Sequence, residues 1–188
     1  SNVIIKDFWK DPKIMDFIKE VIIFSDKGYL KYQTPDGKSI KSHMRLNYIK
    51  NRTEIHVFNH ILNNNEFSKY NRVFKISGRY SLSPNFNIDQ HSQKSKIVFK
   101  KAIPSNQKTI KEVDKLYYCF CWSIDPLIIE DVRNLFSNVE EWLLSRFNKV
   151  LVADMEHGIY AHSNLIDIHE VEELGIFAKI GERDYAYN

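Results

Sequence analysis

The clearest alternation of apolar and polar positions in the chain lies at Arg72–Ile76. A short stretch with β-branched residues at alternate places is typical of a buried strand. The strand is expected to stop at Gly78, because glycine ends the ladder and lets a ligand approach the backbone closely. Arg79 then offers a planar set of donors suited to a phosphate or a carboxylate. Ligands of open α/β sheets bind beyond the carboxyl ends of strands, so this tip is the expected binding site.

The rest of the pattern alternates between short apolar runs and segments with helical spacing. Strands are predicted at residues 20–26, 96–101, 116–122, 150–153 and 175–180, with a hairpin over 29–42 around Pro35-Asp36-Gly37. Helices are predicted at residues 11–19, 55–62, 125–136, from a capping box at 137–140 onward, and around 170–173. This order predicts a single α/β domain over residues 1–188, in which helices flank a mixed sheet.

The composition is that of a folded domain, and the charge and hydropathy restrict the classes of partner that it could bind. The chain has 188 residues, of which 43% are hydrophobic and 13% aromatic, and this argues against disorder. The net charge of +3 is too small to indicate a nucleic-acid partner. No apolar run approaches the ~20 residues of a membrane span, and no signal peptide is visible. A cytoplasmic location is therefore expected.

The two cysteines, Cys119 and Cys121, lie two apart in an aromatic run. Strand alternation would point both side chains to one face, and the chain has no second cysteine pair to complete a zinc site. They are expected to be buried free thiols.

The densest group of titratable side chains follows the predicted strand at 150–153. It contains Asp154, Glu156, His157 and His162 beside a glycine, which is a pattern typical of an active site. His162 is a candidate metal ligand or phosphate contact. The alternative is structural: Asp154 would cap a helix that holds Glu156 and His157 on its solvent-exposed side.

Three further groups are candidates. Lys50 and Glu54 lie in a basic stretch before the helix predicted from residue 55, where an anion can bind; the alternative is a solvated helix start. Asp26 follows a predicted strand and is a ligand contact or a turn residue. His56 and His60 lie four apart on one helix face, but no acid lies between them and no third ligand follows.

One segment resembles a known family. The segment is Phe74-Lys75-Ile76-Ser77-Gly78-Arg79-Tyr80, followed by Leu82 and Phe86. It resembles a segment of a group of small bacterial and phage glycosyltransferases with a GT-A-like nucleotide-sugar fold. In ordinary GT-A enzymes the corresponding strand ends in Asp-x-Asp, which holds a divalent metal against the nucleotide diphosphate. Here Ser77-Gly78-Arg79 stands in that place. The resemblance covers about residues 45–165.

The resemblance implies roles for the candidates. Arg79 and Lys75 would offset the charge of the diphosphate, beside Ser77, Gly78 and Tyr80. Lys50 and Glu54 partly match a charged segment that lies close to the donor, and Asp26 would contact the base or ribose. Inverting transfer needs a carboxylate to take the proton of the acceptor hydroxyl. Similar enzymes carry this base where Glu156 lies here, with Asp154 as the second candidate.

The sequence therefore predicts a glycosyltransferase of the hexosyltransferase type. It would transfer a sugar from a nucleotide sugar, most plausibly UDP-linked, to a hydroxyl of a glycan or other acceptor, with inversion. A divalent metal, Mn²⁺ or Mg²⁺, is left open as a cofactor. One alternative is a module that binds a nucleotide or carbohydrate without catalysis. The other is a metal-dependent nuclease built on His56 and His60, or on Asp154 and Glu156.

Overall fold

The structure is a computed structural model that describes residues 42–63, 65–77, 80–106, 112–148, 153–180 and 183–187. Within these ranges it is a mixed α/β protein, as the sequence predicts. The elements predicted at residues 11–19 and 20–26, and around Pro35-Asp36-Gly37, lie outside the described residues. Most of the strand predicted at 150–153 does so too.

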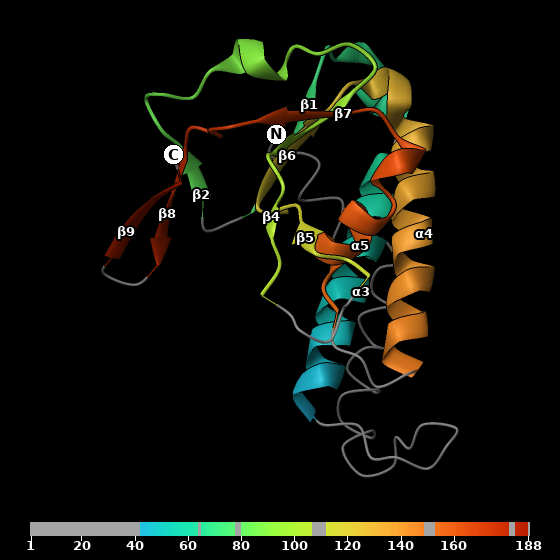
Figure 1. Cartoon of the computed structure of the whole chain (residues 1–188). Coiled ribbons are helices and arrows are strands. Elements are labelled where there is room, and N and C mark those ends of the chain that lie inside the picture. The colour runs from blue at the N-terminus through green and yellow to red at the C-terminus, as the bar shows by residue number, and fades with distance from the viewer. Residues whose placement is uncertain are drawn as a thin grey trace.

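Two long helices form one side of the molecule (Figure 1). They are α3 (Ser42–Leu62) and α4 (Ile129–Asn148), which pack against each other, and the short α5 (Met155–Ala161) packs on α4. In the described ranges, four 3₁₀ helices lie in the connections: η2 (Asn65–Lys69), η3 (Ile88–His91), η4 (Pro126–Ile128) and η5 (Ser163–Leu165).

The central sheet has the strand order β1-β6-β3-β7. Its strands are β1 (Val73–Ile76), β6 (Cys121–Ile124), β3 (Ile97–Lys100) and β7 (Ile168–Val171). Strand β6 is antiparallel to both of its neighbours, and β3 and β7 are parallel. The carboxyl ends of β1, β3 and β7 therefore face the same edge of a mixed sheet.

Two smaller sheets complete the described part of the fold. One has the order β2-β8-β9, and the other pairs β4 with β5. Their strands are β2 (Tyr80–Leu82), β8 (Ile176–Ile180), β9 (Arg183–Tyr187), β4 (Ile103–Pro104) and β5 (Lys115–Leu116). The β4–β5 hairpin lies against α5, which brings it to the side of the central sheet where the helices pack.

Both faces of the central sheet are buried. Phe99 and Trp122 pack into the main core with the helices, and the ring centroid of Phe58 on α3 lies 5.4 Å from that of Trp122. Val98 packs on the opposite face in a smaller cluster. The alternation of side chains along β3 explains this division. The packing of Phe58 on Trp122 fixes α3 against the sheet close to β1, which pairs with β6.

Several predicted elements differ from the observed ones. Helix α3 begins at Ser42 and not near residue 55, so Lys50 and Glu54 lie inside a helix and the predicted helix start beside them is wrong. Helix α4 runs through the predicted capping box, where Ser137 Oγ donates to the carbonyl of Arg133 at 3.0 Å. This bond to the preceding turn lets a serine remain within a helix.

The carboxyl-terminal third also differs. The helix predicted around residues 170–173 is strand β7, whose Ile168 pairs with the buried Ile97 of β3. Strand β6 begins at Cys121, so Cys119 precedes it, and the two thiols pack in different clusters. Both cysteines are buried and free as predicted, but the prediction that they share a face is wrong.

Candidate functional site

The carboxyl end of β1 brings together residues from three distant segments. Lys75 lies in β1, Glu54 in α3, and Glu156 in the first turn of α5. The Lys75 ammonium donates to Glu54 Oε1 at 3.0 Å, to Ser77 Oγ at 2.7 Å and to the backbone carbonyl of Cys119. The side chain of Lys75 is 15% exposed and that of Glu54 28%, so the ion pair is largely withdrawn from water.

The local sequence explains why Lys75 faces α3. Pairing with β6 places Lys75 opposite Trp122, and the Lys75 ammonium lies 5.1 Å from the ring centroid of Phe58. The backbone N–H of Ser77 donates to the carbonyl of Phe120 at 2.8 Å, so pairing continues one residue beyond β1. The end of the strand is thereby held in place up to Ser77.

Glu156 is the acid of this group whose protonation is most perturbed. Burial raises its pKa, and the negative charges of Asp154 and Glu54 raise it further, whereas a backbone hydrogen bond and the charge of Lys50 lower it. These four residues are therefore close enough to interact electrostatically. A carboxylate with a raised pKa accepts a proton at neutral pH more readily than an exposed one.

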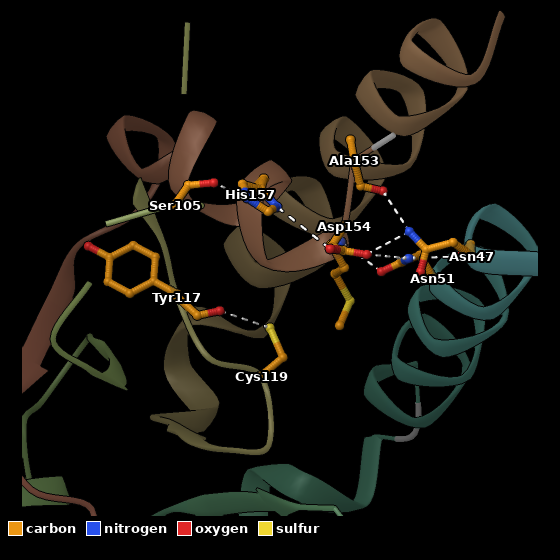
Figure 2. Close-up of polar contacts among 9 residues, drawn as sticks. Asn47, Asn51, Ser105, Tyr117, Cys119, Ala153, Asp154 and His157 are labelled. Carbon is orange, nitrogen blue, oxygen red and sulfur yellow. Dashed lines mark hydrogen bonds and ion pairs between the residues drawn. The ribbon is translucent and has the colours of Figure 1, made fainter. Parts of the chain in front are cut away.

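Asp154 precedes α5 and its side chain points to α3 (Figure 2). Its Oδ1 accepts hydrogen bonds from the amide of Asn47 at 2.6 Å and from that of Asn51 at 3.4 Å. The backbone N–H of Met155 donates to Asn51 Oδ1 at 2.7 Å, so Asn51 caps the helix in place of Asp154. The predicted capping role of the Asp154 side chain is therefore wrong.

His157 is 1% exposed, which excludes the solvent-facing position that the structural alternative gave it. Its Nε2 lies 2.7 Å from Ser105 Oγ and its Nδ1 lies 4.0 Å from Asp154 Oδ2. Burial lowers the pKa of His157, and the charge of Asp154 partly opposes this effect. Sequence analysis missed Ser105, Asn47 and Asn51; the i, i+4 spacing of the two asparagines was a usable signal that they share a helix face.

The remaining predicted residues do not all join this group. Gly78, Arg79 and Asp26 lie outside the described residues. Tyr80 begins β2, its N–H donates to the carbonyl of Ser77 at 2.9 Å, and its ring stacks on Phe120. His162 lies at the other end of α5 from Asp154, with Nδ1 2.9 Å from the carbonyl oxygen of Gly158.

Metal ligands do not gather in the described ranges. In this part of the chain no three His, Cys, Asp or Glu residues are placed to hold a metal ion, and this includes His56, His60 and His162. Asp154 Oδ1 is engaged by the two asparagine amides, and Glu54 by Lys75. The described residues therefore do not fit a carboxylate-held metal of the Asp-x-Asp kind.

A second polar region lies at the amino end of β1. Arg72 donates to Ser123 Oγ at 3.0 Å, to the carbonyl of Ser123 at 3.1 Å and to that of Gln93 at 2.6 Å. Burial lowers the pKa of Arg72 to about 10, opposed by the charge of Asp125. A cavity of about 650 Å³ opens beside it, lined by residues that include Tyr70, Ile88 and Leu127. Sequence analysis did not predict this region.

Comparison with known proteins adds no assignment. No family model, curated protein or solved structure matches the chain. Among the described residues, no helix has the length and apolar character needed to cross a membrane. The function is therefore argued from the site alone.

Proposed function

We propose that the protein is a GT-A-like glycosyltransferase that transfers a sugar from a nucleotide sugar, UDP-linked, to a hydroxyl acceptor. One observation carries this proposal. The residues singled out in sequence segments 50–54, 75–77 and 154–156 lie together at the carboxyl end of β1. A cation, a serine and a carboxylate with a raised pKa are the groups that transfer from a diphosphate leaving group requires.

The donor diphosphate would bind at the end of β1. Lys50, exposed on α3, would supply positive charge, and so would Arg79, which follows Ser77 by two residues in the sequence. Lys75 already has Glu54, Ser77 and the Cys119 carbonyl as acceptors. A phosphate oxygen of the nucleotide sugar would replace one of these acceptors. Binding of the nucleotide sugar would therefore change the position of Glu54 or Ser77.

The acceptor would approach from the side of α5. Its hydroxyl oxygen forms a bond to the anomeric carbon while the bond to the diphosphate breaks and Glu156 takes the hydroxyl proton. Attack from the face opposite the leaving group inverts the anomeric configuration. Burial raises the pKa of Glu156 and so improves it as a base, provided that it is ionised at the working pH.

The test is release of free nucleotide diphosphate from a panel of nucleotide sugars, with and without Mn²⁺ or Mg²⁺, because slow donor hydrolysis needs no known acceptor. Glu156→Gln should lower the release rate by about 10²- to 10⁴-fold. Glu141→Gln, at an exposed position of α4, is the matched control and should keep the wild-type rate.

Two outcomes contradict the proposal. If no donor is hydrolysed but one binds, the protein is a binding module, and this is the second candidate function. If the folded Glu156→Gln variant keeps the full rate, Glu156 is not the base.

A further inference from the structure

Ser105, His157 and Asp154 form a line of side chains beside the site described above (Figure 2). Ser105 follows β4, His157 lies in α5, and Asp154 immediately precedes α5. The Ser105 Oγ to His157 Nε2 distance is 2.7 Å, and the His157 Nδ1 to Asp154 Oδ2 distance is 4.0 Å. A hydroxyl, an imidazole and a carboxylate in this order are the groups of an activated serine nucleophile.

The two ring nitrogens of His157 have different surroundings. His157 is 1% exposed, and its buried Nδ1 has no hydrogen-bond partner. If Nε2 accepts the Ser105 hydroxyl proton, Nδ1 carries the ring hydrogen and faces the Asp154 carboxylate. A buried N–H without a partner costs about 1–3 kcal/mol. The nearby carboxylate reduces this cost, and it does so most strongly when the ring becomes positively charged.

Asp154 and Ser105 are each fixed by contacts outside the line. The amides of Asn47 and Asn51 hold Oδ1 of Asp154, and this orientation turns Oδ2 toward His157. The backbone N–H of Ser105 donates to the carbonyl of Asp114 at 2.7 Å, and this bond anchors the residue to the start of β5. A histidine can activate a serine only when the serine and the acid that orients the histidine are both held in place. Here the contacts of Ser105 and Asp154 meet this condition.

We propose that Ser105 is a nucleophile toward carboxylic esters with a small acyl group, with His157 as its base and Asp154 as the residue that orients His157. Ser105 is half-buried, and limited exposure favours a small acyl group over a large one. This activity goes beyond sugar transfer and does not depend on it, because the nucleophile Ser105 and the base His157 have no role in the proposed transfer. Asp154, which lies beside Glu156, takes part only by orienting His157.

The reaction balances with water as the second substrate. Ser105 Oγ forms a bond to the carbonyl carbon, and its proton moves to His157 Nε2. The bond from that carbon to the alkoxy oxygen breaks, and the alcohol leaves with the proton from Nε2. Water then attacks the acyl-serine, with Nε2 again taking a proton, and a carboxylic acid and free Ser105 are formed.

The test uses the full chain and a fluorophosphonate probe, which phosphonylates activated serines. Peptide mass spectrometry should find the adduct on Ser105, and wild-type protein should hydrolyse p-nitrophenyl acetate. His157→Gln keeps a group able to contact Ser105 but no base, and should slow labelling by about 100-fold. Ser92→Ala removes an exposed serine whose hydroxyl donates to the carbonyl of Ile88, and should label like the wild type.

Ser105→Ala decides the result, because it removes only the nucleophilic oxygen. It also leaves Nε2 of the buried His157 without its partner, so a melting temperature a few degrees below that of the wild type is expected, and the assays are run well below it. Loss of both labelling and ester hydrolysis in this variant supports the proposal. Folded wild-type protein that is not labelled, or equal hydrolysis by wild type and Ser105→Ala, overturns it and leaves the bond between Ser105 and His157 with a purely structural role.

Discussion

The two ends of strand β1 each hold a partly buried cation, but they surround it with different partners. At the amino end, Arg72 donates to neutral oxygens of Ser123 and Gln93. At the carboxyl end, Lys75 meets the carboxylate of Glu54 as well as Ser77. The cavity of about 650 Å³ lies at the amino end, where Asp125 is already bound by the N–H groups of Ser95 and Leu127.

Under the proposed function, the difference indicates which end would hold the reacting groups. The hydrogen bonds of Arg72 join strand β6 to the loop of Gln93 and satisfy carbonyl groups, which is a structural role. The carboxyl end gathers Glu54, Asp154 and Glu156, and the pKa of Glu156 is raised by burial and by these neighbours. Bringing three carboxylates together and burying one of them lowers the stability of the fold. Destabilising arrangements of this kind are found mainly at functional sites. A large cavity alone supplies space for a ligand but no reacting group.

Of these two cations, Lys75 should give the larger effect on activity, which Lys75→Met tests. It removes the charge next to the donor and leaves the Glu54 carboxylate without its partner, so nucleotide diphosphate release should fall by about 100-fold. Steady-state release rates on the best donor of the panel measure this. Lys115→Met, at an exposed position of β5, is the control and should change the rate little. If Lys75→Met releases nucleotide diphosphate at the wild-type rate, Lys75 has no role in the reaction and does not differ from Arg72 in this respect.

Arg72→Met should show the opposite pattern. It leaves the Ser123 and Gln93 carbonyls without their donor, so the free energy of unfolding should fall by about 2 kcal/mol while donor hydrolysis stays within about twofold of the wild type. Urea unfolding measures the stability. Arg133→Met removes a surface pair with Glu130 and should cost less than about 1 kcal/mol. Loss of turnover at normal stability would assign the amino end to the active site.

Local patterns predicted the carboxyl end of β1 well. The short apolar stretch around Phe74 predicted the strand, although its residues are half-buried or exposed and not buried as expected. The role of Glu156, singled out from the titratable group after residue 153, stays a prediction. The sequence also predicted correctly that the chain combines helices with a mixed sheet. That these side chains meet is a tertiary result, which sequence analysis reached only through the family resemblance.

Contacts between distant residues explain what sequence analysis missed. The early start of α3 depends on packing such as that of Tyr48, whose ring centroid lies 4.4 Å from that of Phe147. The bond from Asn47 to Asp154 joins residues 107 positions apart. Residues 168–171 form a strand because β3 offers a parallel partner, although their own pattern suggested a helix. No periodicity within one segment contains this information.

A third prediction concerns His91 at the amino end. Burial, together with the charges of Arg72 and His169, lowers the pKa of His91 to about 4. The Nδ1 of His91 lies 2.8 Å from Ser123 Oγ. The unfolded chain binds the proton near pH 6.5, so the stability that neutral His91 contributes is complete above that pH. It should be lost as the pH falls from about 6.5 toward 4.

Urea midpoints at pH 7.5 and 5 test this prediction, with His91→Gln as the comparison. The wild type should lose more stability than the variant between these two pH values. Equal losses would mean that the protonation of His91 does not contribute to the pH dependence of stability.

The smallest expected effect is the pH dependence of stability that Glu156 causes at the carboxyl end. Its sign is opposite to that of His91. Because the folded state raises the pKa of Glu156, it holds that proton more tightly than the unfolded chain does. The stability that protonated Glu156 contributes is complete below about pH 4.5, the ordinary pKa of a glutamate. It is lost as the pH rises through the pKa of Glu156 in the folded state. Glu156→Gln carries no charge, so its melting temperature should exceed that of the wild type at pH 8, with a smaller difference at pH 5. A variant less stable than the wild type by the same amount at both pH values would show that Glu156 carries no burial cost. The carboxyl end would then be as purely structural as the Arg72 end.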